Sequence, residues 1–185
     1  MVATILPDAL SHTGFRTQRC HSRPLQLYVF GCDVDATVTA AGGLIFDQAA
    51  SGWQVRGFLA SCPDDRAFRV LGADIAPLGN AFGFGFGGFR PDVVVADTSV
   101  FQDDEGIRKQ VAACAEQRGS QILLWGGYWD NDLESRLEPV EYRLSRAAQA
   151  FKKNALRVGG KPDIPSTETF RRAERFDIAS ALARI

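Results

Sequence analysis

The sequence predicts a single α/β domain built around a mostly parallel sheet. Short apolar runs rich in β-branched and aromatic residues recur along the chain, and stretches with apolar residues at helical spacing lie between them. Strands that alternate with helices form βαβ units, whose helices cover both faces of a parallel sheet. A chain of 185 residues is long enough for one domain, and its 45% hydrophobic and 23% charged residues are ordinary for a globular protein.

The elements follow one another in a regular order. Residues 1–24 are polar and irregular, so they are expected to form a lead-in segment, with at most a short helix. Five apolar runs predict strands at 25–31, 53–60, 92–96, 121–125 and 140–144. Helical patterns predict helices at 35–51, 104–118, 145–156 and 169–184, with a weaker pattern at 66–75.

Capping residues mark the ends of three of these helices. Asp35 is expected to cap the first helix, because a short carboxylate there accepts hydrogen bonds from free backbone N–H groups and favours the positive end of the helix dipole. Ser145 stands in the equivalent place before the helix at 145–156. Gly119 follows the helix at 104–118, where a left-handed residue is favoured.

Together these elements predict a single-domain three-layer sandwich over residues 1–185, with a mostly parallel, Rossmann-like sheet. Ligands bind such sheets at the carboxyl ends of the strands. A site is therefore expected among the segments that follow the strands, namely Cys32–Asp35, Ser61–Asp65, Asp97–Asp104 and Gly126–Asp132.

Charge and hydropathy argue against several kinds of partner. A net charge of −1 gives no reason to expect nucleic acid or an anionic membrane surface as a partner. No apolar stretch is long enough to span a bilayer, and the N-terminus lacks the pattern of a signal peptide. We therefore expect a cytoplasmic protein. The four cysteines form no Cys-x-x-Cys pair, so the sequence does not suggest a zinc ribbon.

Several motifs share their order with one known family. A buried strand is followed by a short acidic motif, a glycine pair, a late helix with Lys-x-x-Ala-Leu and a Glu-x-Phe. They are Leu25–Gly31, Cys32-Asp33-Val34-Asp35, Gly42-Gly43, Lys152–Leu156 and Glu174-Arg175-Phe176. In this arrangement the chain resembles the LmbE/PIG-L family of zinc-dependent N-acetyl-sugar deacetylases.

The resemblance implies a chemistry for which most residues have been replaced. In that family a His-Pro-Asp-Asp motif and a later His-x-Asp-His motif supply the zinc ligands, a general-base Asp and a general-acid His. Here Asp35 matches the ligand Asp, Cys32 replaces the first ligand His, and Val34 replaces the general base. Residues 97–108 contain no histidine at all. The resemblance therefore implies a protein that has lost the standard zinc site and binds a ligand or partner as a pseudoenzyme.

Two enzymatic alternatives stay open. The chain could be a working hydrolase of an N-acyl amino sugar or similar amine, with zinc held by Cys32 and Asp35, since a thiolate also binds zinc. Acidic residues at 103–105 would supply further ligands, although an acidic run before a helix is more often a dipole-compensating first turn. Alternatively, Cys32 could act as a nucleophile without metal. The candidate catalytic residues are then Cys32 and Asp33, and the cofactor is either none or zinc.

Two aromatic segments suggest binding surfaces. Trp125, Tyr128 and Trp129 stand at the carboxyl edge of the predicted sheet, where they could stack against a sugar-like small molecule or close the core. The run Phe82–Phe89 alternates phenylalanine with glycine. It could line an apolar pocket, form a contact between copies of the chain in a homo-oligomer, or cover the core.

Overall fold

A computed structural model describes residues 3–5, 24–83, 91–116, 120–127, 137–156 and 164–173. The strands in this part of the chain are β1 (Ala3–Ile5), β2 (Gln26–Gly31), β3 (Gln54–Leu59), β4 (Asp74–Pro77), β5 (Val93–Asp97), β6 (Gln121–Trp125), β7 (Leu137–Arg143) and β8 (Thr167–Ala173). The helices are α2 (Val34–Ala50), α3 (Arg66–Val70), α4 (Asn80–Gly83), α5 (Val100–Asp103), α6 (Glu105–Glu116) and α8 (Arg146–Ala155). None of these helices is long and apolar enough to cross a membrane.

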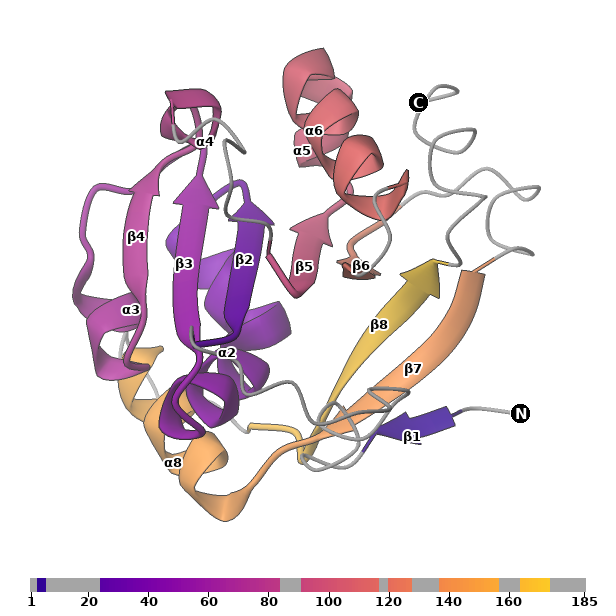
Figure 1. The fold of residues 1–185 in the computed structure, drawn as a ribbon. Coiled ribbons are helices and arrows are strands. Elements are labelled where there is room, and N and C mark those ends of the chain that lie inside the picture. The colour runs from indigo at the N-terminus through magenta and orange to yellow at the C-terminus, as the bar shows by residue number, and fades with distance from the viewer. Residues whose placement is uncertain are drawn as a thin grey trace.

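The eight described strands form one sheet in the order β1-β7-β8-β6-β5-β2-β3-β4 (Figure 1). Strands β4, β3, β2, β5 and β6 run parallel to one another, whereas β8 runs antiparallel to both β6 and β7. The chain builds outwards from β2 to β3 and β4, then returns to the other side of β2 to form β5. This reversal places a topological switch point between β2 and β5, which is where open α/β sheets bind their ligands.

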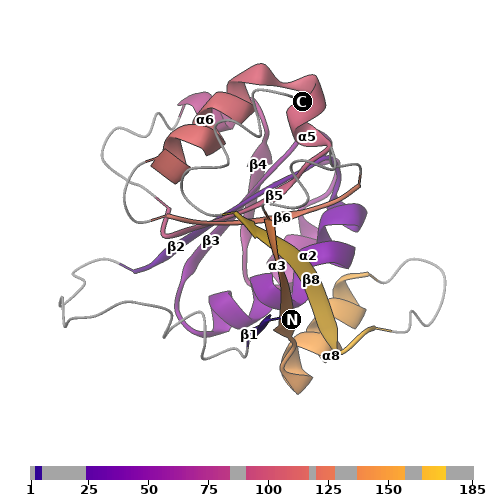
Figure 2. The same ribbon diagram turned by 90° about the vertical axis from the view of Figure 1, so that its right-hand side faces the viewer.

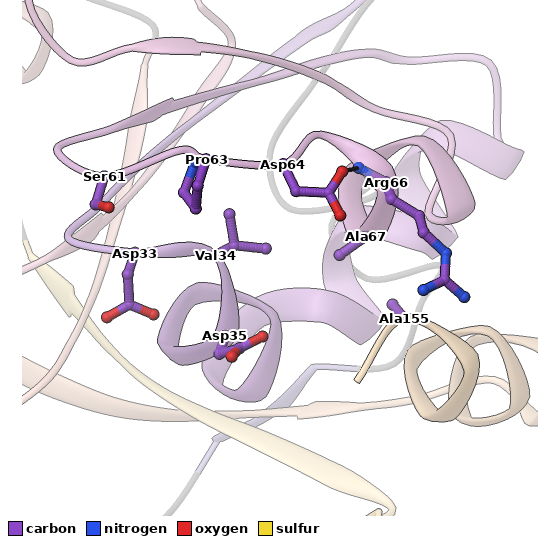
Figure 3. A pocket seen from close by; sticks show the side chains of 9 residues that line it. All are labelled: Asp33, Val34, Asp35, Ser61, Pro63, Asp64, Arg66, Ala67 and Ala155. Carbon is purple, nitrogen blue, oxygen red and sulfur yellow. Dashed lines mark hydrogen bonds between the residues drawn. The ribbon is translucent and has the colours of Figure 1, made fainter. Parts of the chain in front are cut away.

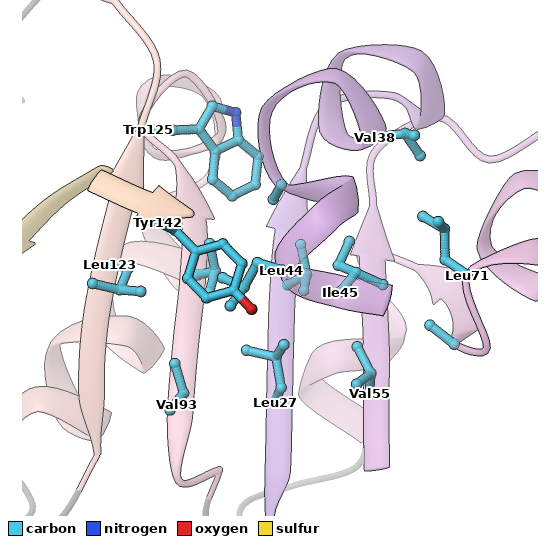
Figure 4. Close-up of a cluster of buried hydrophobic side chains, with 14 of the residues drawn as sticks. Leu27, Val38, Leu44, Ile45, Val55, Leu71, Val93, Leu123, Trp125 and Tyr142 are labelled. Atoms are coloured by element: carbon cyan, nitrogen blue, oxygen red, sulfur yellow. The ribbon is translucent and has the colours of Figure 1, made fainter. Parts of the chain in front are cut away.

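Helices lie on both faces of the sheet, so the predicted three-layer α/β fold is confirmed. Figure 2 shows α5 and α6 on one side of the sheet and α2 and α8 on the other. The side chains of β2 alternate between two buried clusters: Leu27 and Val29 pack towards α2, and Phe30 joins the cluster under α6. Figure 4 shows the first cluster, in which Leu44 and Ile45 of α2 lie over the strands.

Three strands were not predicted, and one predicted helix is wrong over its described part. β1 lies inside the expected lead-in segment and pairs with β7. β4 follows the short helix α3, where a single helical pattern was expected over 66–75. Residues 169–173, expected to begin the last helix, belong to strand β8. Residues 174–184 of that expected helix lie outside the described part of the chain.

The glycine pair of α2 allows another part of the chain to approach the helix closely. A Cβ at Gly43 would lie 2.3 Å from Cγ of Leu144, and one at Gly42 would lie 3.3 Å from Cγ of Lys152. Through this gap a buried ion pair reaches the helix backbone: Lys152 Nζ lies 2.6 Å from Oε1 of Glu168, and both side chains are 1% exposed.

The Lys152–Glu168 pair bonds directly to the backbone of α2. Lys152 Nζ donates to the carbonyl oxygen of Thr39 at 2.7 Å, while Glu168 accepts from the N–H groups of Gly43 at 2.7 Å and Leu44 at 3.0 Å. In a regular helix the carbonyl of residue 39 and the N–H of residue 43 are partners. The ion pair therefore joins α8 and β8 to the middle of α2. The Glu-x-Phe pattern also occurs at 168–170, and this copy, on β8, supplies the buried carboxylate.

A second buried polar group joins α2 to β7 and to the start of α8. Asp47 accepts hydrogen bonds from the Tyr142 hydroxyl at 3.0 Å and the Ser145 hydroxyl at 2.6 Å. Ser145 in turn accepts from the N–H of Ala148 at 2.9 Å, which confirms its predicted capping role. Burial, together with the negative charge of Asp47, raises the pKa of Tyr142 well above its ordinary value, so the phenol stays neutral.

Candidate functional site

The carboxyl ends of β2 and β5 meet at the switch point of the sheet. Cys32 directly follows β2, and Asp97 is the last residue of β5. Ser99, two residues beyond Asp97, joins them: its Oγ lies 3.2 Å from Sγ of Cys32 and donates to Oδ1 of Asp97 at 2.6 Å. The backbone N–H of Ser99 also donates to Oδ1 of Asp97, at 2.9 Å. A chain of hydrogen bonds therefore runs from the thiol to the buried carboxylate.

The direction of this chain bears on what Cys32 can do. An ionised carboxylate only accepts hydrogen bonds, so the hydroxyl proton of Ser99 is committed to Asp97. The Ser99 oxygen then offers lone pairs to Cys32, whose S–H is the donor. The thiol of Cys32 is therefore engaged with Ser99, and nucleophilic attack or metal binding would have to replace this contact.

Gly126, the first residue after β6, completes the edge of this group. Its backbone φ is +108°, and a Cβ there would lie 2.7 Å from Oδ1 of Asp97 and 2.8 Å from Oγ1 of Thr98. Both the left-handed conformation and the close approach require glycine. The segments expected to surround a site, those after β2, β5 and β6, therefore do meet in space. The sequence of these segments gave no sign that Ser99 would connect Cys32 to Asp97.

In the acidic motif after β2, the two aspartates have different roles from those predicted. Asp33, not Asp35, is the N-cap of α2: its φ of −144° is extended, and its Oδ1 accepts from the N–H of Ala36 at 2.8 Å. The expected capping role of Asp35 is therefore wrong. The helix cap lies two residues earlier than predicted, because Asp33 already fits the cap geometry. Asp35 lies in the first turn of α2, where its exposed carboxylate is still favoured by the helix dipole.

A pocket of about 370 Å³ opens beside this motif, at the carboxyl ends of β2 and β3. Three segments supply most of its walls: the start of α2, the loop after β3 and the start of α3, with one residue from the end of α8. Figure 3 shows the lining residues Asp33, Val34, Asp35, Ser61, Pro63, Asp64, Arg66, Ala67 and Ala155. The pocket holds three carboxylates and one guanidinium group, so its walls carry a net negative charge.

Two carboxylates in the segments expected to surround a site serve as local caps. Asp64 accepts from the N–H of Arg66 at 2.9 Å, and Asp104 accepts from Gly106 at 2.9 Å and from Ile107 at 3.1 Å. Glu105 forms an exposed ion pair with Lys109 one turn along α6, and this pair lowers the pKa of Glu105. The acidic run before α6 therefore stabilises the start of that helix, as the simpler interpretation expected.

The described residues do not form the His-Asp-His zinc site of the family that the chain resembles. Cys32 and Asp35 stay a predicted pair of ligands. Within the described ranges, no group of three or more His, Cys, Asp or Glu side chains is placed to hold a metal ion. Both histidines, His12 and His21, lie outside these ranges. The donor set seen therefore does not match a His-Asp-His site, and we assign no step of a reaction to a metal.

The aromatic predictions have separate outcomes. Trp125 lies in the core cluster with Leu123 and Tyr142 and is 8% exposed, which favours core closure over an open stacking surface (Figure 4). Tyr128 and Trp129 lie outside the described residues. So does the Phe82–Phe89 run, except for Phe82 and Gly83, which end α4.

Comparison with known proteins finds similarity in fold and not in sequence. No family model matches the chain, and no curated protein matches it significantly. The fold is similar to the crystal structure of Dbv21, described as the deacetylase of the antimicrobial reagent A40926 pseudoaglycone. The TM-score is 0.58 at 14% sequence identity, and the match covers 83% of this chain and 99% of that one. The chain thus shares its fold with that protein.

Proposed function

We propose that this chain is a divergent LmbE/PIG-L-like protein that binds a small hydroxylated amine in the pocket beside Asp33 and Asp35, without the metal-dependent hydrolysis of that family. The observation that carries the proposal is the pocket itself. It lies at the carboxyl ends of β2 and β3, next to the switch point, and three carboxylates line it. The deacetylase-like fold supports an origin among such enzymes.

The charge of the pocket favours an amine as ligand. Asp33 uses Oδ1 to cap α2, which leaves Oδ2 for a ligand, and the carboxylates of Asp35 and Asp64 are exposed at the same pocket. An exposed ammonium–carboxylate pair contributes only about 0.2–1 kcal/mol. A ligand must therefore engage several of these groups together, and we expect affinity in the range of about 1 mM, or about −4 kcal/mol.

The residues at the family's reactive positions support loss of catalysis. Val34, at the position of the general base, has no group that accepts a proton. Cys32, at the position of the first ligand, is engaged with Ser99. Both positions are thus occupied by a residue that has another contact or lacks the required chemistry.

Titration with glucosamine and with N-acetylglucosamine, followed by NMR, tests the binding. We expect shifts around Asp35 with glucosamine, weaker binding of the acetylated sugar, which lacks the positive charge, and loss of the preference in Asp35→Asn. Glu105→Gln is the matched control, because it removes one carboxylate on the opposite face of the sheet. Equal binding of the two sugars, or none, would overturn the proposal.

A second measurement separates binding from activity. The purified protein is assayed for zinc and for release of acetate from N-acetylglucosamine, before and after zinc is added. We expect no acetate in either case. Stoichiometric zinc that is lost in Cys32→Ala and Asp35→Ala, together with acetate release, would instead establish the hydrolase with a rebuilt Cys/Asp site.

A further inference from the structure

A second cavity lies at the opposite ends of the same strands. Its volume is about 490 Å³, and it is lined by Gln26, Tyr28, Trp53, Gln54, Val55, Arg56, Arg69, Gly72, Ala73 and Asp74. In Figure 1 strands β3 and β4 face the viewer, and most of α2 lies behind the sheet. This cavity shares no residue with the acidic pocket.

A buried carboxamide lines the cavity. Gln26 is 9% exposed, and its backbone is fixed by a 2.8 Å hydrogen bond from its N–H to Oδ2 of Asp92. Its Nε2 lies 3.4 Å from Oε1 of Gln54 on the next strand. Its Oε1 is buried and has no hydrogen-bond partner among the described residues. Turning the Gln26 amide by 180° exchanges Oε1 and Nε2, so one of these two atoms still lies in the position that has no partner.

A buried polar atom without a partner is uncommon in proteins, because leaving it unpaired is costly. In the conformation described, this oxygen is closed to solvent, so a ligand in the cavity supplies the missing partner once the Gln26 side chain turns towards it. Gln26 and Gln54 stand side by side on β2 and β3, so together they present both donors and an acceptor. A carboxamide is suited to pair with the polar edge of a planar heterocycle, as glutamine does with adenine.

The other lining groups fit the remaining parts of such a molecule. Trp53 is half-buried at the cavity and offers an aromatic surface for stacking. Arg56 and Arg69 supply two guanidinium groups, and Arg69 also forms an exposed ion pair with Asp65 at 3.8 Å. Arginine binds planar anions such as phosphate through several parallel hydrogen bonds. The walls therefore combine a hydrogen-bonding edge, a stacking surface and two guanidinium groups.

We propose that this cavity is a second ligand site, which takes a nucleotide-like molecule: a planar heterocycle paired with Gln26 and Gln54 and stacked on Trp53, with an anionic group beside the arginines. The proposal rests on Gln26 and its surroundings and is independent of the function proposed for the acidic pocket. The two sites lie at opposite ends of β2 and β3 and share no lining residue.

NMR titration of the whole chain with AMP, adenosine and inorganic phosphate tests the site. We expect AMP to bind more tightly than adenosine or phosphate. Gln26→Leu should weaken AMP binding at least about tenfold while keeping the fold, because leucine removes the unpaired amide and retains similar volume. Trp53→Leu should also weaken it. Asp35→Asn is the control, and it should leave AMP affinity unchanged.

Three results would overturn the proposal. One is the absence of AMP binding at about 10 mM. Another is an AMP affinity that Gln26→Leu leaves unaltered in a folded protein. The third is inorganic phosphate binding as tightly as AMP, because recognition would then not involve the heterocycle. If glucosamine binding is lost in Asp35→Asn while AMP binding persists, the two sites are established as separate.

Discussion

The buried Lys152–Glu168 pair gives the sharpest prediction of stability. In Lys152→Met the methionine retains much of the side-chain volume but removes the ammonium group. Glu168 then loses its partner 2.6 Å away, and the carbonyl of Thr39 loses its bond to Nζ. The carboxylate keeps only the N–H groups of Gly43 and Leu44. A charge that is 1% exposed is thus left without a counter-ion.

The expected loss of folding free energy in Lys152→Met follows from the groups that still contact Glu168. Removing one partner of a buried ion pair destabilises a protein by about 3–5 kcal/mol, because the other charge stays buried. The two backbone N–H groups still solvate Glu168, so we place the loss near the lower end, at about 3 kcal/mol. Against a total stability of about 5–15 kcal/mol, this is a large fraction.

Urea denaturation at neutral pH, followed by circular dichroism, measures this loss. The control is Lys109→Met, which removes an ammonium from a pair of similar length, 2.8 Å, whose side chains are 75% and 68% exposed. Exposed pairs contribute little, so this control should leave the urea midpoint near that of the parent. The double variant Lys152→Met/Glu168→Gln should recover part of the loss, because no buried charge is then left unpaired. Equal small effects of Lys152→Met and Lys109→Met would refute the reasoning.

Three further predictions concern the same part of the molecule. Burial raises the pKa of Glu168 above its ordinary 4.5, although Lys152 opposes the shift. The folded state therefore binds the Glu168 proton more tightly than the unfolded state does, and the stability of the parent relative to Glu168→Gln should fall as pH rises above about 4.5. Urea denaturation at several pH values measures this fall. Tyr142 keeps its proton in the folded state but loses it near pH 10 when the chain is unfolded. The stability of the parent should therefore fall above pH 10 by up to about 1.4 kcal/mol per pH unit, and Tyr142→Phe should remove this slope. Gly43→Ala places a methyl group 2.3 Å from Leu144 and should lower the stability measured by urea denaturation by about 1–3 kcal/mol. Gly79→Ala, whose methyl group meets no atom within 4 Å, should leave the stability unchanged. Equal effects of the two variants would contradict the packing argument.

The central strands could be predicted because their residues are apolar on both sides. β2 and β5 are buried on both faces, so their sequences are continuous apolar runs that no solvent-exposed element would carry. β8 gave no such signal. Its sequence TETFRRA is mostly polar, and its buried Glu168 is tolerated only because Lys152, distant in sequence, reaches it. Local pattern does not contain that information.

The site was predicted at the level of segments and missed at the level of contacts. The carboxyl ends of parallel strands meet by geometry, which is why the segments around Cys32 and Asp97 could be placed together. The bond between Cys32 and Ser99 joins residues 67 positions apart and depends on the register of β2 against β5. Asp33 and Asp35 are both plausible caps, and only the backbone conformation at Asp33 decides between them.

The bonds between the Lys152–Glu168 pair and α2 have an evolutionary consequence. Gly42, Gly43, Lys152 and Glu168 occupy one packed space, so replacement of any of them requires a matching change in another. Selection for folding then preserves these four positions together. They offer a sequence signature by which other chains with the same packing can be found.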